Sequence, residues 1–281
     1  RAFRPKVNEK RRGRHYTERL GWQTERHVPF MIWHCGRFDF DTSTPIVMGI
    51  LNITPDSFSD GGLYLDADAA VEHALAMVDA GAAIVDVGGE STRPGSDAVD
   101  PAEEWERIGA VIAALAERGL CVSVDTRHAE VASRALAAGA SIVNDVSGFR
   151  DPAMAQVAAK SGCGCVVMHM AGEPKTMQEN PTYVDVVVEV RDYLRDRAAA
   201  LEAAGIDHSR ICIDPGPGFG KTPKQTIELM RNLHELVHLG YPVMVAASRK
   251  SYVSAAYKLD GADMHERDVA SAAEALLACE L

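Results

Sequence analysis

Hydrophobic and polar positions follow one repeated order along the chain. An alanine-rich segment with apolar residues every three to four positions leads into a small residue and Gly, then a short apolar run, then polar residues. The order recurs in "AGAAIVDVGGES" (80–91), "AGASIVNDVSG" (138–148) and "LGYPVMVAASRK" (239–250). The 3.6-residue period predicts helices that end at the Gly. The continuous apolar runs predict parallel strands buried on both faces.

Seven such strands are predicted, and they end near residues 52, 88, 125, 144, 169, 214 and 248. Their alternation with helices indicates βαβ units, which close either as a (β/α)8 TIM barrel or as an open doubly wound sheet. An open sheet would place a G-x-G-x-x-G turn after its first strand. Here residues 52–62 read N-I-T-P-D-S-F-S-D-G-G. Because nearly every strand ends in polar residues, we expect an α/β fold of the barrel type, with seven β/α units present.

Composition is typical of a soluble globular protein, with 47% hydrophobic and 25% charged residues over 281 positions. No apolar run approaches the ~20 residues of a membrane span, and no early segment has the order of a secretory signal. The six cysteines fit no zinc spacing. Four of them lie in apolar runs, so we expect buried free thiols in a reducing cytoplasm: Cys121, Cys163, Cys165 and Cys212.

Charge divides the chain into two parts. Residues 1–30 hold nine Lys or Arg against three acids, whereas residues 31–281 carry a formal charge of −17 within an overall −11. We expect 1–30 to be a basic appendage outside the fold and 31–281 to be one domain. The acidic body argues against nucleic acid as a partner.

Polar residues at the predicted strand ends suggest what this domain binds. Asp125, Asn144 and Asp214 together would suit a flat heterocycle that carries N–H and NH2 donors. Lys250 shares the strand face of Ser248 and could contact the acceptors of the ring. Each residue also has a structural interpretation, since Asp125 could cap a helix and Asp214 could start a turn.

Two further features point to a phosphorylated substrate. Arg93, Lys221 and Arg249 place positive charge in an otherwise acidic domain, and Asn52 is a hard oxygen ligand of the kind that Mg2+ accepts beside phosphate and water. No nucleophile–His–acid arrangement accompanies them, and His169 is as consistent with a structural role.

Seven motifs in order resemble dihydropteroate synthase over residues from about 32 to the end: "MGILNITPDSFSDGG" (48–62), "DVGGESTRPG" (86–95), "SVDT" (123–126), "NDVSG" (144–148), "HMAGEPKTMQ" (169–178), "DPGPGFGK" (214–221) and "SRKS" (248–251). The resemblance implies condensation of 6-hydroxymethyl-7,8-dihydropterin diphosphate with 4-aminobenzoate, which gives 7,8-dihydropteroate and diphosphate in folate biosynthesis. It implies Mg2+ as cofactor and a homodimer.

The resemblance also implies roles for individual residues. Asn52 would bind Mg2+, and the pterin pocket would comprise Asp125, Asn144, Asp214, Phe219 and Lys250. Thr92 would lie at the bound substrate, and Ser251 would meet the carboxylate of the aminobenzoate. Phe58 and Asp60 in a first loop, and Arg93 and Pro94 in a second, would close over that substrate. Catalysis would fall to Asp60, Arg93 and Lys250.

One part of the family pattern is not matched. Residues 267–281 read as the seventh helix, and a further strand and helix would need at least ~30 residues. We therefore expect the eighth β/α unit to be missing from this chain. A catalytically inactive pterin-binding fragment is one alternative function. A pterin-dependent methyltransferase domain, which shares the barrel and the pterin pocket, is the other.

Overall fold

The computed structural model describes residues 31–53, 63–91, 95–259 and 261–280 of the chain. Predictions about residues 1–30, about Phe58 and Asp60, and about Thr92, Arg93 and Pro94 lie outside the described residues.

A parallel sheet of six strands forms the centre of the fold, with its strands hydrogen-bonded in chain order. The strands are β3 (Met48–Asn52), β4 (Ile84–Gly88), β5 (Cys121–Asp125), β6 (Ile142–Asp145), β7 (Gly164–Met168) and β8 (Ile211–Asp214). Because the order is sequential and every pairing is parallel, each crossover passes over the same face. The predicted α/β class with parallel pairing is confirmed.

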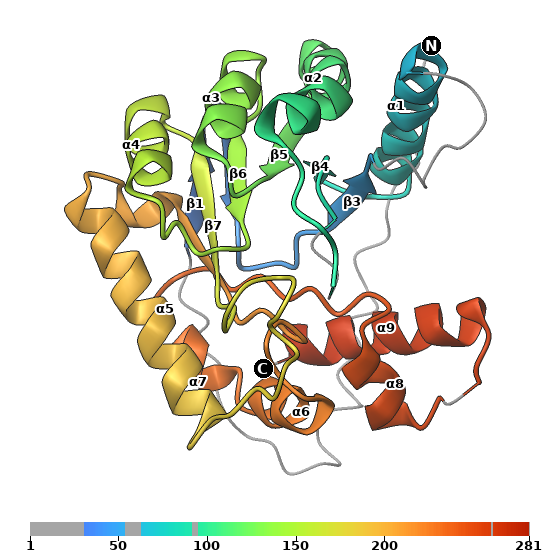
Figure 1. Cartoon of the computed structure of the whole chain (residues 1–281), viewed down its shortest axis with the longest axis vertical. Helices are drawn as coiled ribbons and strands as arrows, with labels where there is room; N and C mark the ends of the chain where they lie inside the picture. The colour runs from blue at the N-terminus through green and yellow to red at the C-terminus, as the bar shows by residue number, and fades with distance from the viewer. Residues whose placement is uncertain (1–30, 54–62, 92–94, 260, 281) are drawn as a thin grey trace, which may run out of the picture.

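Helices follow one another around the outside of this sheet, from α1 at the upper right of Figure 1 to α9 at the lower right. Many begin at capping residues that the sequence displays, such as Asp100 before Pro101 and the Thr222–Gln225 capping box. The helices are α1 (Leu63–Asp79), α2 (Pro101–Glu117), α3 (Ala129–Ala137), α4 (Pro152–Ser161), α5 (Val186–Ala203), α6 (Pro223–Arg231), α7 (His234–Val237), α8 (Ser251–Tyr257) and α9 (Met264–Cys279).

The predicted seventh strand is not formed as a regular strand. Val243 makes one isolated parallel bridge with Ile213, supported by a hydrogen bond from Met244 N to Ile213 O of 2.9 Å. Beyond it, residues 244–250 adopt no strand conformation. The prediction of seven complete β/α units is therefore not confirmed, because an apolar run indicates burial but not a full ladder of hydrogen bonds.

The two faces of the sheet are both buried, but by different partners. The helices cover one face, with Val85, Val122 and Val143 in the main core. On the other face, Ile84, Cys121, Ile142, Val166 and Cys212 pack against Trp33 and Cys35. These inner-face residues lie near the amino ends of their strands. The inner face is therefore apolar at the amino end of the sheet.

A short antiparallel hairpin covers this amino end of the inner face. It comprises β1 (Ile32–Cys35) and β2 (Phe38–Asp41), and Trp33 Nε1 donates to Arg210 O at 3.0 Å. Cys35 lies so close to β7 that a Cβ on Gly164 would be 2.5 Å from its Sγ. The hairpin closes one end of the inner face and leaves the carboxyl ends of the strands as the open end.

Candidate active site

The inner face of the sheet changes from apolar to polar toward the carboxyl ends of its strands, which we call the carboxyl face. Side chains alternate along a strand, so the residues two positions after Ile84, Cys121, Ile142 and Cys212 point the same way. Those residues are Asp86, Ser123, Asn144 and Asp214, and all of them are buried. The sequence therefore places polar groups in one layer directly above an apolar one.

Register brings several predicted site residues side by side. Gly88 pairs with Asp125 across β4 and β5, and Asp125 pairs with Asn144 across β5 and β6. Because Gly88 has no side chain, Asn52 and Asp125 meet above it. A Cβ there would be 3.4 Å from Asn52 Oδ1 and 3.4 Å from Asp125 Oδ2. The amide of Asn52 and the carboxylate of Asp125 thus lie near each other above Gly88.

The loop after β8 supplies a second group of predicted residues. Asp214 Oδ1 accepts a hydrogen bond of 2.7 Å from Gly216 N. Gly216 has φ +60°, and a Cβ there would be only 2.0 Å from His169 O, so only glycine lets the loop lie against the end of β7. Lys250 Nζ lies 4.7 Å from the ring centroid of Phe219, a cation–π contact that joins two predicted pocket residues.

Burial shifts the protonation of these groups. It raises the pKa of Asp125 well above its usual range, with repulsion from Asp86 and Glu104 adding to the effect. Burial also raises the pKa of Asp214, whereas Lys250 opposes that shift. The pKa of Lys250 is lowered to about 8 by burial, against the attraction of Asp214. A hydrogen-bond donor would stabilise the buried carboxylates of Asp125 and Asp214, and an acceptor would stabilise the ammonium of Lys250.

Such partners are missing among the described residues. No hydrogen bond or ion pair with a described side chain or backbone group is made by four polar groups: the carboxylate of Asp125, Asn144 Oδ1, Asp214 Oδ2 and Lys250 Nζ. Three acceptors and one cation therefore lie together at the carboxyl face. This is the arrangement of a polar ligand site, since unpaired groups in a low-dielectric setting are costly.

The ammonium of Lys221 is directed into the loop after β8 and is not presented to a phosphorylated ligand as predicted, although its charge lowers the pKa of Asp214. Its side chain is 2% exposed, and Nζ donates to the carbonyl oxygens of Gly216 and Phe219 at 3.0 Å and of His169 at 3.3 Å. Nζ also lies 2.8 Å from His169 Nδ1. Burial lowers the pKa of Lys221 to about 7 and that of His169 to about 3. Both residues hold the loop after β8 in place.

Arg249 and Ser251 differ in what they offer. The exposed guanidinium of Arg249 is paired with Asp268 through two contacts of 2.6 and 2.9 Å, so its charge is already neutralised. Ser251 is exposed at the first residue of α8, directly after Lys250.

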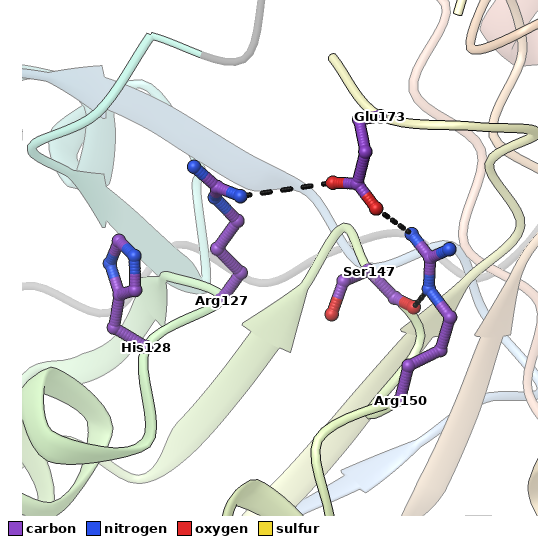
Figure 2. Close-up of a pocket in the computed structure, with 5 residues that line it drawn as sticks. All are labelled: Arg127, His128, Ser147, Arg150 and Glu173. Carbon is purple, nitrogen blue, oxygen red and sulfur yellow. Dashed lines mark hydrogen bonds and ion pairs between the residues drawn. The ribbon is translucent and has the colours of Figure 1, made fainter. Parts of the chain in front are cut away.

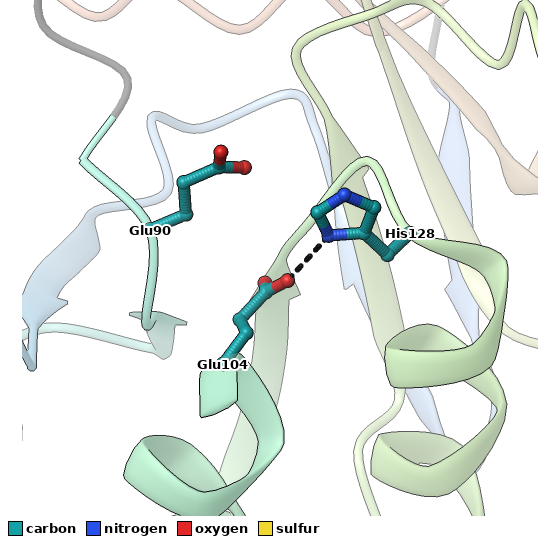
Figure 3. Close-up of side chains that lie close together, drawn as sticks. All are labelled: Glu90, Glu104 and His128. Atoms are coloured by element: carbon teal, nitrogen blue, oxygen red, sulfur yellow. Dashed lines mark hydrogen bonds and ion pairs between the residues drawn. The ribbon is translucent and has the colours of Figure 1, made fainter. Parts of the chain in front are cut away.

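A cluster of charged residues lies beside the site and was not predicted as a unit. Glu90, Glu104 and His128 place ligand-type atoms within 4.8 Å of one another (Figure 3). His128 Nδ1 lies 2.7 Å from Glu104 Oε2, and Arg127 contacts both oxygens of Glu90 at 2.9 and 3.0 Å. A cation here would have to displace Arg127 and the His128 proton, so the cluster fits a divalent ion poorly. Because Glu90, Glu104 and the adjacent Arg127 and His128 come from three separate segments, their spacing gives no motif.

An open pocket of about 290 Å3 adjoins this cluster, lined by Arg127, His128, Ser147, Arg150 and Glu173. Figure 2 shows the Glu173 carboxylate between the two guanidinium groups, 3.8 Å from Arg127 and 3.4 Å from Arg150. The arginine charges are thus balanced within the protein.

Comparison with known proteins gives consistent results. A family profile described as "Pterin binding enzyme" matches residues 48–280. Dihydropteroate synthase of Neisseria meningitidis serogroup C is 48% identical over 232 residues, which cover 81% of each chain. The structure of Xanthomonas albilineans dihydropteroate synthase with 4-aminobenzoic acid has a TM-score of 0.82 at 41% identity and 90% coverage of both chains. The Burkholderia cenocepacia enzyme complexed with 7,8-dihydropteroate has a TM-score of 0.79 at 40% identity, covering 89% of this chain and 88% of that one.

Proposed function

This chain belongs to the family of pterin-binding enzymes, and we propose that it is a transferase of the dihydropteroate synthase type. It would condense 6-hydroxymethyl-7,8-dihydropterin diphosphate with 4-aminobenzoate to give 7,8-dihydropteroate and diphosphate. One observation supports this most directly: acceptors on Asp125, Asn144 and Asp214 lie at one face with the ammonium of Lys250, and these groups have no hydrogen-bond partner in the part of the chain that the structure describes.

The pterin ring has the complementary groups. Its 2-amino group and ring N–H groups are donors, which suit the three acceptors, and its carbonyl and ring nitrogen acceptors suit Lys250. Phe219, half-buried beside Lys250, offers a flat apolar surface to the ring. We assign pterin binding to these five residues.

We propose that Asn52, at the end of β3, binds Mg2+. The amide oxygen lies above Gly88 beside the carboxylate of Asp125, and both groups supply hard oxygen donors. Mg2+ binds through few protein ligands and keeps water and phosphate oxygens as the others. When bound, the ion would stabilise the negative charge of the diphosphate. The cluster of Glu90, Glu104 and His128 receives no such assignment, since its charges are already paired.

Catalysis by this site would rest on positioning. Phe219, Asp214 and Lys250 would hold the ring so that its methylene carbon faces the incoming amine. The amine nitrogen bonds to that carbon as the carbon–oxygen bond to diphosphate breaks, and the amine releases a proton. No covalent intermediate with the protein is needed, so no nucleophilic side chain is required.

Ser251 and residues outside the described ranges complete the proposal. By their place in the family motifs, Thr92 would lie at the bound substrate, and Phe58, Asp60, Arg93 and Pro94 would close over 4-aminobenzoate. Ser251 would bind its carboxylate, and its exposure at the start of α8 supports that role. Asp60 and Arg93, together with Lys250, remain the proposed catalytic residues.

Finer properties of the molecule also belong to the proposal. We propose that the six-stranded sheet belongs to a barrel of the (β/α)8 type, that residues 31–281 form one domain, and that the enzyme works in the cytoplasm. Five buried free cysteines support a reducing location. A homodimer is supported by exposed apolar side chains on α9: Met264, Val269, Leu276 and Leu277. Among the described residues, no helix combines the length and hydropathy needed to cross a membrane.

The test is product formation by the full chain with both substrates and Mg2+. We expect one 7,8-dihydropteroate and one diphosphate for each pterin diphosphate consumed. Binding of the pterin without product would favour an inactive pterin-binding fragment. Methyl transfer from a methylated pterin to a cobalamin protein would favour the methyltransferase alternative.

A further inference from the structure

A buried carboxylate lies directly behind the proposed pterin site and contacts one of its residues. Asp86, on β4, is 4% exposed, and its Oδ2 accepts a hydrogen bond of 2.9 Å from Asn144 Nδ2 on β6. The two residues lie 58 positions apart in the sequence, and β5 separates their strands in the sheet. The bond therefore crosses the inner face below Asp125.

An asparagine side chain can occupy the same space in two orientations, because its oxygen and its NH2 group have nearly the same shape. One orientation presents an acceptor to a ligand and the other presents donors. A carboxylate oxygen accepts hydrogen bonds, so only the NH2 group of Asn144 can face Asp86 Oδ2. The Asn144 oxygen must then point away from Asp86.

The surroundings of Asp86 preserve this arrangement when the carboxyl group is protonated. Asp86 Oδ1 and Ser123 Oγ are both buried, the two residues are register partners on β4 and β5, and the Ser123 hydroxyl opposes the rise in the pKa of Asp86. A proton on Oδ1 would be directed toward Ser123 and would leave Oδ2 as an acceptor. Burial raises the pKa of Asp86, in keeping with such a proton.

We propose that Asp86 is a positioning residue that fixes the orientation of the Asn144 amide. In this orientation Asn144 Oδ1, which has no partner among the described residues, faces the carboxyl face as an acceptor beside Asp125 and Asp214. The inference rests on the proposed function, because it explains why the site presents three acceptors to the donor edge of a pterin. Without Asp86, the amide could rotate and present donors to donors.

A double-mutant cycle on the full chain tests this proposal. Asp86→Ala should raise the KM for the pterin diphosphate at least tenfold, and the KM for 4-aminobenzoate at saturating pterin should change less than twofold. Asn144→Ala should have a similar effect, and the double variant should be no worse than Asn144→Ala alone. Asp86→Asn keeps an acceptor for the Asn144 NH2 group and should stay within threefold of wild type.

Ser141→Ala is the matched control, since Ser141 is a buried serine that directly precedes β6 at the amino end of the strand, away from Asp86 and the carboxyl face. It should leave both KM values unchanged. Independent effects, with the double variant losing the product of the two single losses, would overturn the proposal. So would a Ser141→Ala defect as large as that of Asp86→Ala.

A measurement on the wild-type chain covers the case in which Asp86→Ala does not fold. Hydrogen exchange of the Asn144 side-chain NH2, followed by NMR, should be slow, because that group is buried against Asp86. Exchange at the rate of a free amide would show that the NH2 group faces solvent and would overturn the proposal. Failure of the wild-type chain to make dihydropteroate would instead contradict the proposed function, and the exchange rate would still report the amide orientation.

Discussion

Lys221 and Lys250 both have lowered pKa values, yet their surroundings indicate different roles. Lys221 has three backbone carbonyls and His169 around its ammonium, so its charge serves the loop that carries Asp214. Lys250 contacts the face of Phe219 and has no hydrogen-bond partner among the described residues. At the scale of single residues, the presence or absence of a protein partner separates a structural lysine from a ligand-binding one.

Asn52 gives a prediction at this scale. Asn52→Ala should lower turnover by tens-fold or more, because the variant loses the oxygen proposed to bind Mg2+ beside the diphosphate. Asn52 is exposed at the end of β3, so the free energy of unfolding should change by no more than about 1 kcal/mol. Turnover and chemical denaturation of the same preparations provide both values.

The dependence on Mg2+ separates this role from a general defect. Asn52→Ala should need more Mg2+ for half-maximal rate, whereas Ser251→Ala, at the proposed aminobenzoate end, should not. An unchanged Mg2+ dependence, or a large loss of stability with full activity in the folded fraction, would remove Asn52 from the metal site.

Some of these residue roles could be predicted from the sequence, and some could not. Asp125, Asn144 and Asp214 end apolar runs, so strand geometry alone brings them to one face. The role of Lys221 could not be predicted, because a long side chain can turn back into the loop that carries it. Asp86 lies inside a strand, where only register reveals that its carboxylate reaches Asn144 on a strand that is not its neighbour.

At the scale of elements, the loop from Asp214 to Lys221 connects the sheet to the site. The buried ammonium of Lys221 donates to Gly216 O within this loop, and the lack of a side chain on Gly216 lets the loop lie against the end of β7. Helices were predictable because their period runs over many residues, and the parallel strands because a continuous apolar run follows each helix and its Gly. The β1–β2 hairpin was missed because its two four-residue strands follow no predicted helix and mix apolar with polar residues. The segment after Val243 is apolar like a strand but forms only one bridge.

The buried ammonium of Lys221 gives this loop a distinctive pH dependence. Its pKa is about 7 in the folded chain and near 10.5 when exposed, so between those values the unfolded chain binds a proton that the folded chain lacks. The free energy of unfolding should therefore rise with pH over this window through Lys221. Below pH 7 both forms carry the proton, and the slope from this group should vanish.

Comparison with Lys221→Met isolates this contribution from other titrating groups. The free energy of unfolding of the wild type minus that of Lys221→Met should increase from pH 7 to pH 10. Denaturant titration of both proteins at each pH measures this difference. Parallel curves for the two proteins would show that the folded chain does not hold Lys221 at a lowered pKa. Lys224→Met, on the exposed start of α6, should run parallel to wild type and serves as the control.

At the scale of the whole molecule, charge and exposed apolar surface set its associations. The −17 charge of residues 31–281 disfavours nucleic acid, whereas the small anionic substrates reach a site with its own cation. Val269 and Leu276 lie seven residues apart on α9 and hence on one side of it, and both are more than half exposed. Such a stripe is typical of a surface that another copy covers.

We expect sedimentation to show a dimer that weakens in Leu276→Asp, because the substitution places a charge in the covered stripe. Val188→Asp, a similar change at an exposed position of α5, should leave the dimer intact. A wild-type chain that stays monomeric at every concentration, or equal effects of the two substitutions, would contradict this interface.

The central claim is that the acceptors at the carboxyl face bind the donor edge of a pterin, and Asp214→Asn tests it most directly. Asp214 Oδ1 already accepts from Gly216 N, so in the variant the amide oxygen keeps that bond and the NH2 group replaces the free acceptor. A donor would then face a donor on the ring. We predict that calorimetric titration with 6-hydroxymethyl-7,8-dihydropterin, which lacks the diphosphate, shows one site in the wild-type chain and a loss of about 2–3 kcal/mol or more in the variant. Equal affinity of the two proteins for this ligand would contradict the account, because the ring would then bind elsewhere.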